Sequence, residues 1–351
     1  MRSRAVYSAL VGAALIAACA PWPTEEPRPQ LLHREFLAMG TQISVSVRVG
    51  DDDRKRAHEA IEDVRRTIDQ FGQDWWAWGD GELAHINKEL SAGRAAEIPE
   101  FMRPLFQRAW EIHRLSDGRY EPRIGALVRL WGFDDVARIR ETPPGNREID
   151  RALADLRLAP DYDGGAHYGP ARGVTWDFGG IAKGYIVDAA LEELRDRGFP
   201  DAMVDAGGNL AARGTPGEKP WRVAIHDPRA DLTDRDYLAT LSIGGEAVNT
   251  HADDQRSFIS RGQRYGHILN PRTGRPAHGL VSVTVVHHDG ALADAGGVAL
   301  YVAGAKRWRA LARKLGLDEV LVVDEDGRVT ATEKLAPRLK LAPGVALHIV
   351  P

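Results

Sequence analysis

The chain has 351 residues, of which 43% are hydrophobic and 27% are charged, as in ordinary globular proteins. Its single cysteine excludes an intramolecular disulfide, a C-x-x-C redox motif and a zinc site built from several cysteines. The net charge of −4 excludes a broad basic face of the kind that captures nucleic-acid backbones.

The first residues predict an export signal. Arg2 and Arg4 precede an uncharged stretch over residues 5–18, and Cys19 follows two alanines. This stretch is shorter than the roughly 20 residues that a membrane-spanning helix needs, so we expect it to be cleaved. Small residues before a cysteine resemble the bacterial lipobox, in which cleavage leaves Cys19 as a lipidated N-terminus. A plain secretory signal with an incidental cysteine is the alternative.

This interpretation divides the chain into three parts. Residues 1–18 form a signal peptide of the lipoprotein type, residues 19–32 a lipidated cysteine with a proline-rich tether, and residues 33–351 the folded domain. Four prolines between residues 20 and 30 favour an extended, semi-rigid tether. We therefore expect a body on the periplasmic, extracytoplasmic side of a bacterial membrane, anchored there by its N-terminal lipid.

The folded part begins with a strand and a helix. Strict alternation over residues 42–49 predicts a half-buried strand. The aspartates at 51–53 should cap the following helix. The apolar stripe of that helix consists of Ala57, Ile61, Val64, Ile68 and Phe71.

Further along, a second helix is expected over residues 104–115, ending at Asp117-Gly118. Near the C-terminus, residues 319–323 and 328–332 flank an acidic turn and predict a hairpin, because an EF-hand loop would need more oxygen ligands. Strands and helices interleave without the even rhythm of a doubly wound sheet. The predicted fold class is α+β, with mixed sheets and packed helices in two closely associated lobes.

A glycine-rich turn with a lysine lies in the middle of the chain. A short apolar strand over residues 174–178 should run into Gly179 and Gly180, and a helix should begin around Lys183 and continue to about Arg197. Glycines let backbone N–H groups approach an anion, while the helix N-terminus and the lysine add positive potential. The pattern suits a phosphate or pyrophosphate, with a purely structural turn as the alternative. It is neither a P-loop nor a dinucleotide-binding motif.

Polar and titratable residues gather in residues 249–256 and 265–274, at the ends of a hairpin with its turn near Gly262. Loops on a rigid scaffold often carry function. His267 is the best candidate proton acceptor in the chain. The alternative is that residues 270–274 are ordinary turn chemistry and His267 is a satisfied polar group.

One acid interrupts an apolar helix. The helix is expected over residues 292–300, after a strand over residues 281–286, and contains Asp294. An unpaired aspartate is costly to bury, so Asp294 should contact a cation or a strong donor. A helix N-cap is the alternative.

Three of the nine tryptophans, Trp75, Trp76 and Trp78, lie close together in the sequence. Such a cluster can stack on a planar ring. Packing in an ordinary core is the alternative.

Taken in order, several stretches of the chain resemble the bacterial FAD:protein FMN transferases, the ApbE-type lipoproteins long labelled thiamine-biosynthesis lipoproteins. The resemblance covers roughly residues 36–304. The matching stretches are 39–41, 117–122 with 130–133, 177–185 with Asp188, 205–209, 267–274 and 293–295.

The resemblance implies that residues 33–351 are a flavin transferase domain. In the implied reaction, FAD with Mg²⁺ is split at its pyrophosphate, FMN passes to a Ser or Thr hydroxyl of an exported or membrane redox protein, and AMP is released. These requirements agree with an anion-binding turn, a hard cation and a base. Nucleic acid is not an expected partner.

The resemblance also implies roles for single residues. Residues at positions where the family contacts or surrounds FAD are Met39, Trp78, Arg119, Tyr120, Glu121, Asp177, Lys183 and Ile268. For the metal, Asp294 occupies the carboxylate position and Gly180 the position of a backbone carbonyl ligand. His267 is the candidate base or phosphate-orienting group. Trp78 lies where the family has a ring-stacking tyrosine.

The chain departs from the family pattern in the same pocket. Val298 stands where a threonine metal ligand is typical, one helical turn after Asp294, and its side chain has no oxygen. The family's Thr-Ser-Gly is replaced by Thr-His-Ala at 250–252. Asn270 and Glu121 replace aspartates.

These changes leave three interpretations open: a divergent but active branch, a changed metal geometry, or a flavin binder that has lost transfer. The alternatives to the transferase are therefore a non-catalytic flavin-binding lipoprotein and an FAD pyrophosphatase that gives FMN and AMP. His251, Asp253 and Asp254 are candidate substitute metal ligands.

Overall fold

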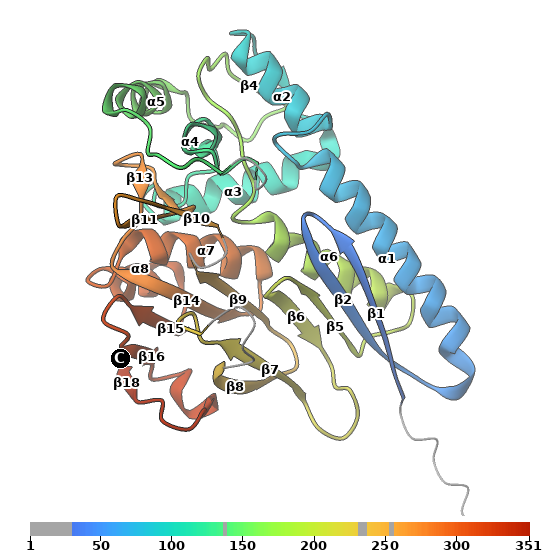
Figure 1. The fold of residues 1–351 in the computed structure, drawn as a ribbon. Coiled ribbons are helices and arrows are strands. Elements are labelled where there is room, and N and C mark those ends of the chain that lie inside the picture. Colours follow the sequence, from blue (N-terminus) through green and yellow to red (C-terminus); the bar gives the residue numbers. More distant parts are fainter. Residues whose placement is uncertain (1–29, 136–138, 231–236, 253–255) are drawn as a thin grey trace, which may run out of the picture.

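A nine-stranded sheet forms the centre of the protein (Figure 1). The computed structural model describes residues 30–135, 139–230, 237–252 and 256–351, so Cys19 and the predicted signal peptide lie outside the described residues. The strands, in their order across the sheet, are β1 (Gln30–Ala38), β2 (Thr41–Val49), β5 (Ala202–Ala206), β6 (Asn209–Arg213), β9 (Ala247–Ala252), β14 (Leu280–His287), β15 (Glu319–Asp324), β16 (Val329–Thr332) and β18 (Leu347–Val350).

Neighbouring strands of this sheet run antiparallel, except that β16 and β18 are parallel. Four smaller sheets accompany it. They are β3 (Ala96–Glu97) with β4 (His167–Tyr168), β10 (Ser257–Ser260) with β11 (Gln263–Gly266), β12 (Leu269–Asn270) with β13 (Arg275–Pro276), and β17 (Lys340–Leu341) with β8 (Tyr237–Ile243) and β7 (Trp221–His226).

Helices cover one face of the large sheet and gather beyond one of its ends. The α-helices are α1 (Arg54–Asp74), α2 (Glu82–Ser91), α3 (Arg103–Leu115), α4 (Gly125–Trp131), α5 (Asn146–Leu158), α6 (Ala182–Asp196), α7 (Gly290–Ala303) and α8 (Trp308–Leu315). Short 3-10 turns occur at Asp51–Asp53, Glu100–Met102 and Ala336–Arg338. Among the described residues, no helix combines the length and the apolar character that crossing a bilayer requires.

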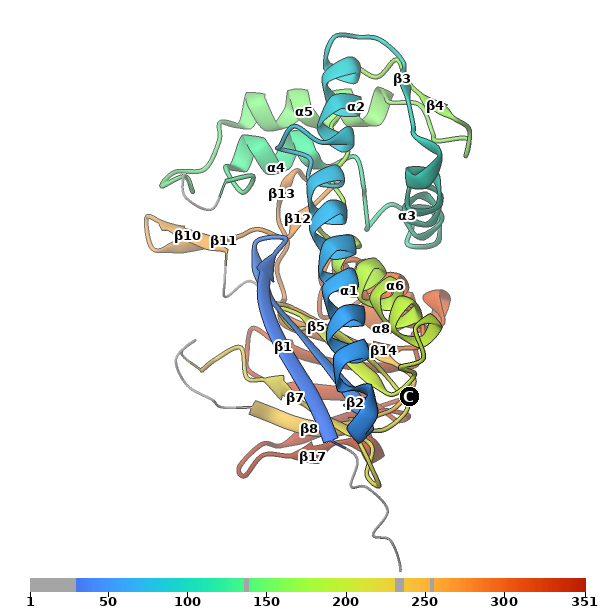
Figure 2. The ribbon, with the colours of Figure 1, turned by 90° about the vertical axis from the view of Figure 1, so that its right-hand side faces the viewer.

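Helices α1, α6 and α7 pack on one face of the sheet, and α8 packs on α7. The small sheet of β7, β8 and β17 lies on the opposite side and shares a separate apolar cluster with it. Helices α2 to α5 lie beyond the sheet, at the top of Figure 1, while Figure 2 shows α1 running from this upper part down along β1 and β2. One continuous core connects the upper helices with α6 and α7.

Trp176 is the centre of the upper part of this core. It is fully buried and lies 4.7 Å from the ring of Phe106 and 5.0 Å from that of Tyr168, measured between ring centroids. Both backbone groups of Trp176 are hydrogen-bonded by the side chain of Asn87 on α2. The segment that leads into α6 is therefore fixed by the upper helices.

Most predicted elements are confirmed. β2 buries alternate residues as expected, and the predicted stripe of α1 is buried. α3, β14, α7 and the hairpins β10–β11 and β15–β16 also occur where the patterns predict them. The mixed sheet with packed helices confirms the α+β class.

Two local predictions are wrong, and the alternative that Asp294 is a helix N-cap is wrong as well. Residues 174–178 form no strand, because only Thr175 makes a bridge, to Ile124. The aspartates at 51–53 form a 3-10 turn, and the N-cap of α1 makes no side-chain hydrogen bond. Asp289, whose side chain accepts from the N–H of Leu292, caps α7, so Asp294 lies inside the helix.

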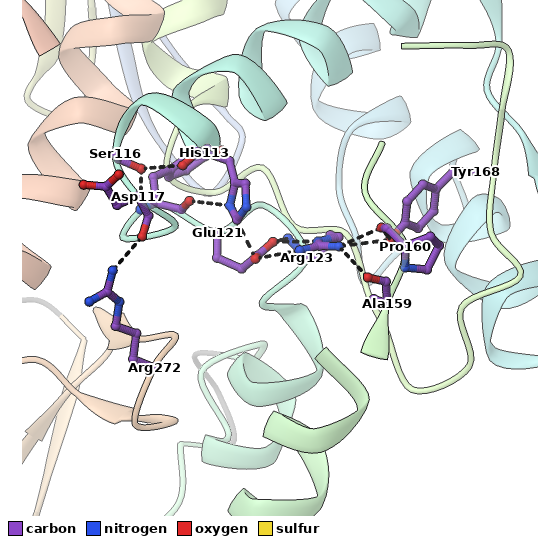
Figure 3. Close-up of polar contacts among 10 residues, drawn as sticks. His113, Ser116, Asp117, Glu121, Arg123, Ala159, Pro160, Tyr168 and Arg272 are labelled. Carbon is purple, nitrogen blue, oxygen red and sulfur yellow. Dashed lines mark hydrogen bonds and ion pairs between the residues drawn. The ribbon is translucent and has the colours of Figure 1, made fainter. Parts of the chain in front are cut away.

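A buried ion pair stabilises the loop between α3 and α4 (Figure 3). Arg123 donates to both carboxylate oxygens of Glu121, at 2.8 and 2.9 Å, and to the carbonyl of Pro160. Its guanidinium also lies over the ring of Trp110. Both charged side chains are about 5% exposed. Burial lowers the pKa of Arg123, but the hydrogen bonds and charge of Glu121 outweigh this effect and raise it.

Replacing Arg123 tests this pair. Arg123→Met should lower the free energy of unfolding by about 3 kcal/mol, because it leaves the buried Glu121 carboxylate without its charged partner, with the backbone N–H of residue 123 and His113 nearby. Urea denaturation measures the loss. Arg94→Met is the matched control, since the pair of Arg94 with Glu89 is exposed and should matter little. Equal effects of the two substitutions would contradict the structural role of the buried pair.

Candidate active site

The N-terminus of α6 packs closely against α7. Gly184, in the first turn of α6, has no side chain, and a Cβ atom there would overlap the carbonyl oxygen of Gly290 at the start of α7. Close packing of the two helices therefore requires glycine at this position. It also brings the first turn of α6, which contains Lys183, next to Asp294 on α7.

Asp294 is fully buried beneath this turn. The backbone N–H of Gly184 donates to its Oδ2 at 2.9 Å, as expected for an amide that the helix itself leaves without a partner. Its Oδ1 has no hydrogen-bond partner. Burial raises the pKa of Asp294 to about 6, opposed mainly by the charge of Lys183. The expectation that Asp294 contacts a strong donor is therefore confirmed.

Lys183 is half-buried in the same place. Burial lowers the pKa of its ammonium group, while the carboxylates of Asp294 and Asp205 act in the opposite direction. Asp205 lies at the end of β5 and accepts from the N–H of Gly208. A cation thus lies within electrostatic range of two carboxylates at a helix N-terminus, where an anionic ligand is favoured.

His251, on β9, also lies next to Asp294. Its Nε2 is 3.4 Å from Asp294 Oδ1, and this nitrogen is buried without a hydrogen-bond partner. Burial, followed by the charge of Lys183, lowers the pKa of His251 to about 3. The imidazole is therefore neutral at neutral pH.

Gly180 lies where Tyr120 and Val298 meet. A Cβ atom on Gly180 would be 3.0 Å from Val298 Cγ2 and 3.5 Å from Tyr120 Cε2. The hydroxyl of Tyr120 is buried and has no hydrogen-bond partner. Burial, with the nearby charges of Asp294 and Asp177, raises the pKa of Tyr120 well above its usual value. Gly180, Tyr120 and Asp294 therefore belong to one cluster, and Val298 presents methyl groups to it.

His267 follows β11. Its Nδ1 lies 3.3 Å from the carbonyl oxygen of Arg256. Burial lowers the pKa of His267 to about 3, and the charges of Arg256 and Lys183 lower it further. Because a carbonyl only accepts, the neutral ring must carry its proton on Nδ1, which leaves the lone pair of Nε2 available.

The other predicted flavin contacts are distributed over several elements. Met39 occupies the tip of the β1–β2 hairpin with a φ of 52°, which is uncommon for a residue other than glycine. Trp78 is half-buried, and the guanidinium of Arg129 lies 4.6 Å from its ring centroid. The predicted tryptophan cluster is divided, because Trp75 packs in the core whereas Trp76 is 55% exposed.

Four further predicted residues have local partners. Asp177 accepts from the N–H of Gly179 at 2.8 Å, and burial raises its pKa. Arg119 donates to the carbonyl of Ser116 at 3.1 Å. Ile268 is buried. Glu121 uses both oxygens in the pair with Arg123, which implies that any effect on a ligand is exerted through the loop.

The described residues fit a divalent cation that takes few ligands from the protein. Among them, no three side chains of His, Cys, Asp or Glu gather as a metal site. However, Asp294 Oδ1 is an orphaned buried oxygen, and Mg²⁺ at phosphate sites is often held by one or two carboxylates with water and substrate oxygens. Asp253 and Asp254, considered as substitute ligands, lie outside the described residues.

Sequence reasoning did not assign roles to Asp205, Arg256 or Gly297. Asp205 precedes a Gly-Gly pair, a signal that could have marked it as a turn near the site. Arg256 acts on the pKa of both His267 and Asp177, which depends on the folded arrangement. Gly297 leaves space for His251, a contact between residues far apart in the chain.

Comparisons with known proteins agree with this geometry. The model of the ApbE family matches residues 39–321. A FAD:protein FMN transferase of Rhodobacter capsulatus is 33% identical over 88% of this chain, and the chain spans 58% of that relative's length. A protein of the same name from Salmonella typhimurium is 30% identical, over 90% of this chain and 91% of its own length.

Solved structures give the same result. The crystal structure of the ApbE protein from Thermotoga maritima superimposes with a TM-score of 0.78 and 28% identity, over 88% of this chain and 99% of its own. The flavin transferase ApbE from Vibrio cholerae gives a TM-score of 0.76 and 25% identity over the same shares of the two chains. By the extent of the matched sequence and by its fold, the chain belongs to the ApbE family.

Proposed function

We propose that this chain is an FAD:protein FMN transferase that moves FMN from FAD to a Ser or Thr hydroxyl of a target protein and releases AMP. The observation that carries the proposal is the contact of the Lys183 turn with Asp294, which sets an anion-binding helix N-terminus beside a buried carboxylate with one free oxygen. The similarity of almost the whole folded chain to proteins named for this activity supports it.

The reaction is a phosphoryl transfer that needs no redox partner. The bond between the bridging oxygen of the pyrophosphate and the phosphorus of FMN breaks, and a bond from the acceptor hydroxyl oxygen to that phosphorus forms. The hydroxyl proton is released to solvent, and AMP departs with the bridging oxygen. Enzymes promote such transfers mainly by positioning the reactants and stabilising negative charge.

Lys183 and the first turn of α6 provide the positive potential for the pyrophosphate in this proposal. The low-dielectric surroundings that lower the pKa of Lys183 also strengthen its attraction to phosphate oxygens. Asp205 and Asp294 oppose the fall in the pKa of Lys183 and so favour its charged form.

Asp294 and the carbonyl of Gly180 would hold the divalent cation, for which Mg²⁺ is the expected ion. Such a cation, when bound, neutralises the charge that develops on the phosphate oxygens. Asp294 keeps its Oδ1 available because Oδ2 is occupied by the N–H of Gly184.

His267 would orient the acceptor hydroxyl or the phosphate through Nε2. Its low pKa makes the imidazole a hydrogen-bond acceptor at neutral pH, since Nδ1–H faces the Arg256 carbonyl. Met39, Trp78, Arg119, Tyr120, Asp177 and Ile268 would surround the flavin nucleotide, whereas Glu121 would hold the loop between α3 and α4.

The cellular setting forms part of the proposal. The basic and apolar N-terminal residues with Cys19 favour an exported lipoprotein on the periplasmic side of a bacterial membrane. Its acceptor would be an exported or membrane redox protein. Detection of a diacylated Cys19 by mass spectrometry of the mature protein would test the anchor.

One assay separates the candidate activities. The protein is incubated with FAD, Mg²⁺ and an acceptor domain, and in-gel flavin fluorescence and free AMP are measured. A fluorescent acceptor with an equal amount of AMP supports the transferase. AMP with free FMN and no labelled acceptor would indicate hydrolysis, and bound FAD without either product would leave a flavin-binding protein.

Lys183→Met should weaken FAD binding by at least about tenfold, because it removes the positive charge of a half-buried side chain that would face the pyrophosphate. Equilibrium titration of flavin fluorescence measures the dissociation constant. Lys55→Met is the matched control, since Lys55 is 89% exposed on α1. Unchanged FAD affinity in Lys183→Met would remove this lysine from the nucleotide site.

Asp294→Asn should abolish cation-dependent transfer while preserving the fold, because the amide oxygen still accepts from Gly184 but carries no charge. Rates at increasing Mg²⁺ and thermal unfolding measure the two effects.

Val298→Thr should equal or exceed the rate of the unaltered protein with Mg²⁺, because it adds an oxygen near Gly180. A clear loss in Val298→Thr, or full activity in Asp294→Asn, would contradict this metal site.

A further inference from the structure

Two buried polar atoms without hydrogen-bond partners face each other between β9 and α7. They are Oδ1 of Asp294 and Nε2 of His251, 3.4 Å apart. We propose that His251 is a further protein ligand of the divalent cation, so that this chain binds the ion through an imidazole nitrogen as well as through oxygen atoms. The inference rests on the proposed function for the presence of a cation and deepens it by specifying the ligand set.

The separation of the two atoms fits a shared cation. Ligand atoms that lie about 2.1 Å from one cation are about 3.0 Å apart at the right angle of an octahedral site and about 3.4 Å apart at a tetrahedral angle. The observed separation of 3.4 Å lies at the upper end of this range. A direct hydrogen bond fits less well, because N–H···O bonds in proteins measure about 2.7–3.2 Å.

The fold leaves space for the imidazole at a specific point. Gly297 lies inside α7, where glycine costs up to about 1 kcal/mol relative to alanine. A Cβ atom at Gly297 would lie 2.8 Å from His251 Nε2, closer than real side chains approach. The unfavourable residue in the helix is therefore the residue that admits the ring beside Asp294.

The same helix lacks the oxygen that a Mg²⁺ site would use. Val298, next to Gly297, directs Cγ2 towards Gly180 and offers no ligand atom. Strand β9, on which α7 packs, supplies His251 instead. The exchange of an oxygen for an imidazole nitrogen favours transition-metal ions over Mg²⁺, because imidazole suits these ions better.

The consequence is a change in metal preference. We expect the protein with FAD to bind Mn²⁺ and Co²⁺ at least about tenfold more tightly than Mg²⁺, in line with the order of affinities of nitrogen-containing sites. Transfer should continue with these ions, since a transition-metal cation also neutralises phosphate charge.

The experiment detects the nitrogen directly. The purified protein is loaded with Mn²⁺ in the presence of FAD, and electron spin echo envelope modulation is recorded for the bound ion. Modulation from a directly coordinated ¹⁴N nucleus is expected. Its absence from bound Mn²⁺, or the failure of Mn²⁺ to bind while FAD binds, would overturn the proposal.

Variants identify the nitrogen. His251→Ser should abolish the modulation and weaken Mn²⁺ binding at least about tenfold, since even outer-shell partners contribute 10–100-fold to metal affinity. His58→Ser, on α1, is the matched control and should change neither. Modulation that persists in His251→Ser but disappears in His267→Gln would assign the ligand to His267 and refute the proposal.

Two further variants test the proposal without relying on the removal of the His251 side chain alone. Gly297→Ala should displace the ring and reduce the modulation with His251 still present. The double variant His251→Ser/Val298→Thr should bind Mg²⁺ more tightly than the unaltered protein does, and its Mn²⁺-loaded form should show no ¹⁴N modulation. If Gly297→Ala retains the modulation at full depth, the packing argument fails.

The metal measurement and the transfer assay test the two proposals independently. ¹⁴N modulation without a labelled acceptor would preserve this metal site and contradict the proposed transferase. A labelled acceptor without ¹⁴N modulation would preserve the transferase and overturn the role of His251.

Discussion

The close approach of α6 and α7 is the constraint on which the site depends. Gly184 permits it, and three polar contacts hold it: Gly184 N–H with Asp294, Gly290 N–H with Asp188, and the amide of Asn249 with the Gly290 carbonyl. These contacts tie two helices and strand β9 at one point. A wider separation would leave the Asp294 carboxylate without its donor, and burying such a group unpaired is costly.

That constraint explains the electrostatics of the site. Burial shifts the pKa values of Asp294, Lys183 and the two histidines in the direction that favours the neutral form of each group. The charges that remain interact strongly, because the protein interior screens them less than water does. Three buried polar atoms without hydrogen-bond partners lie in the described cluster, namely Tyr120 Oη, His251 Nε2 and Asp294 Oδ1. Such atoms are expected where a ligand completes the set.

The sequence predicts features that depend on neighbouring residues. The alternation of β2, the stripe of α1 and the buried acid in α7 follow from local periodicity. The motif around Lys183 indicates an anion site because glycines and a helix start are local as well. The same local reasoning wrongly predicts a strand at 174–178. The backbone of this apolar run is held instead by the side chain of Asn87, which comes from a helix far away in the sequence.

The site could be predicted only in part because its decisive distances join separate elements. Asp294 is recognisable as an unusual acid, but its separation from His251 depends on the pairing of β9 with β14 and on the packing of α7 across them. Gly297 and Val298 acquire meaning in the same way. Taken alone, Gly297 is a glycine that weakens a helix, and Val298 is the loss of a ligand. Together with His251, the two residues describe a single change. The ring needs the space left by Gly297, and with Val298 offering no oxygen, the imidazole nitrogen is the atom that remains to face the free oxygen of Asp294.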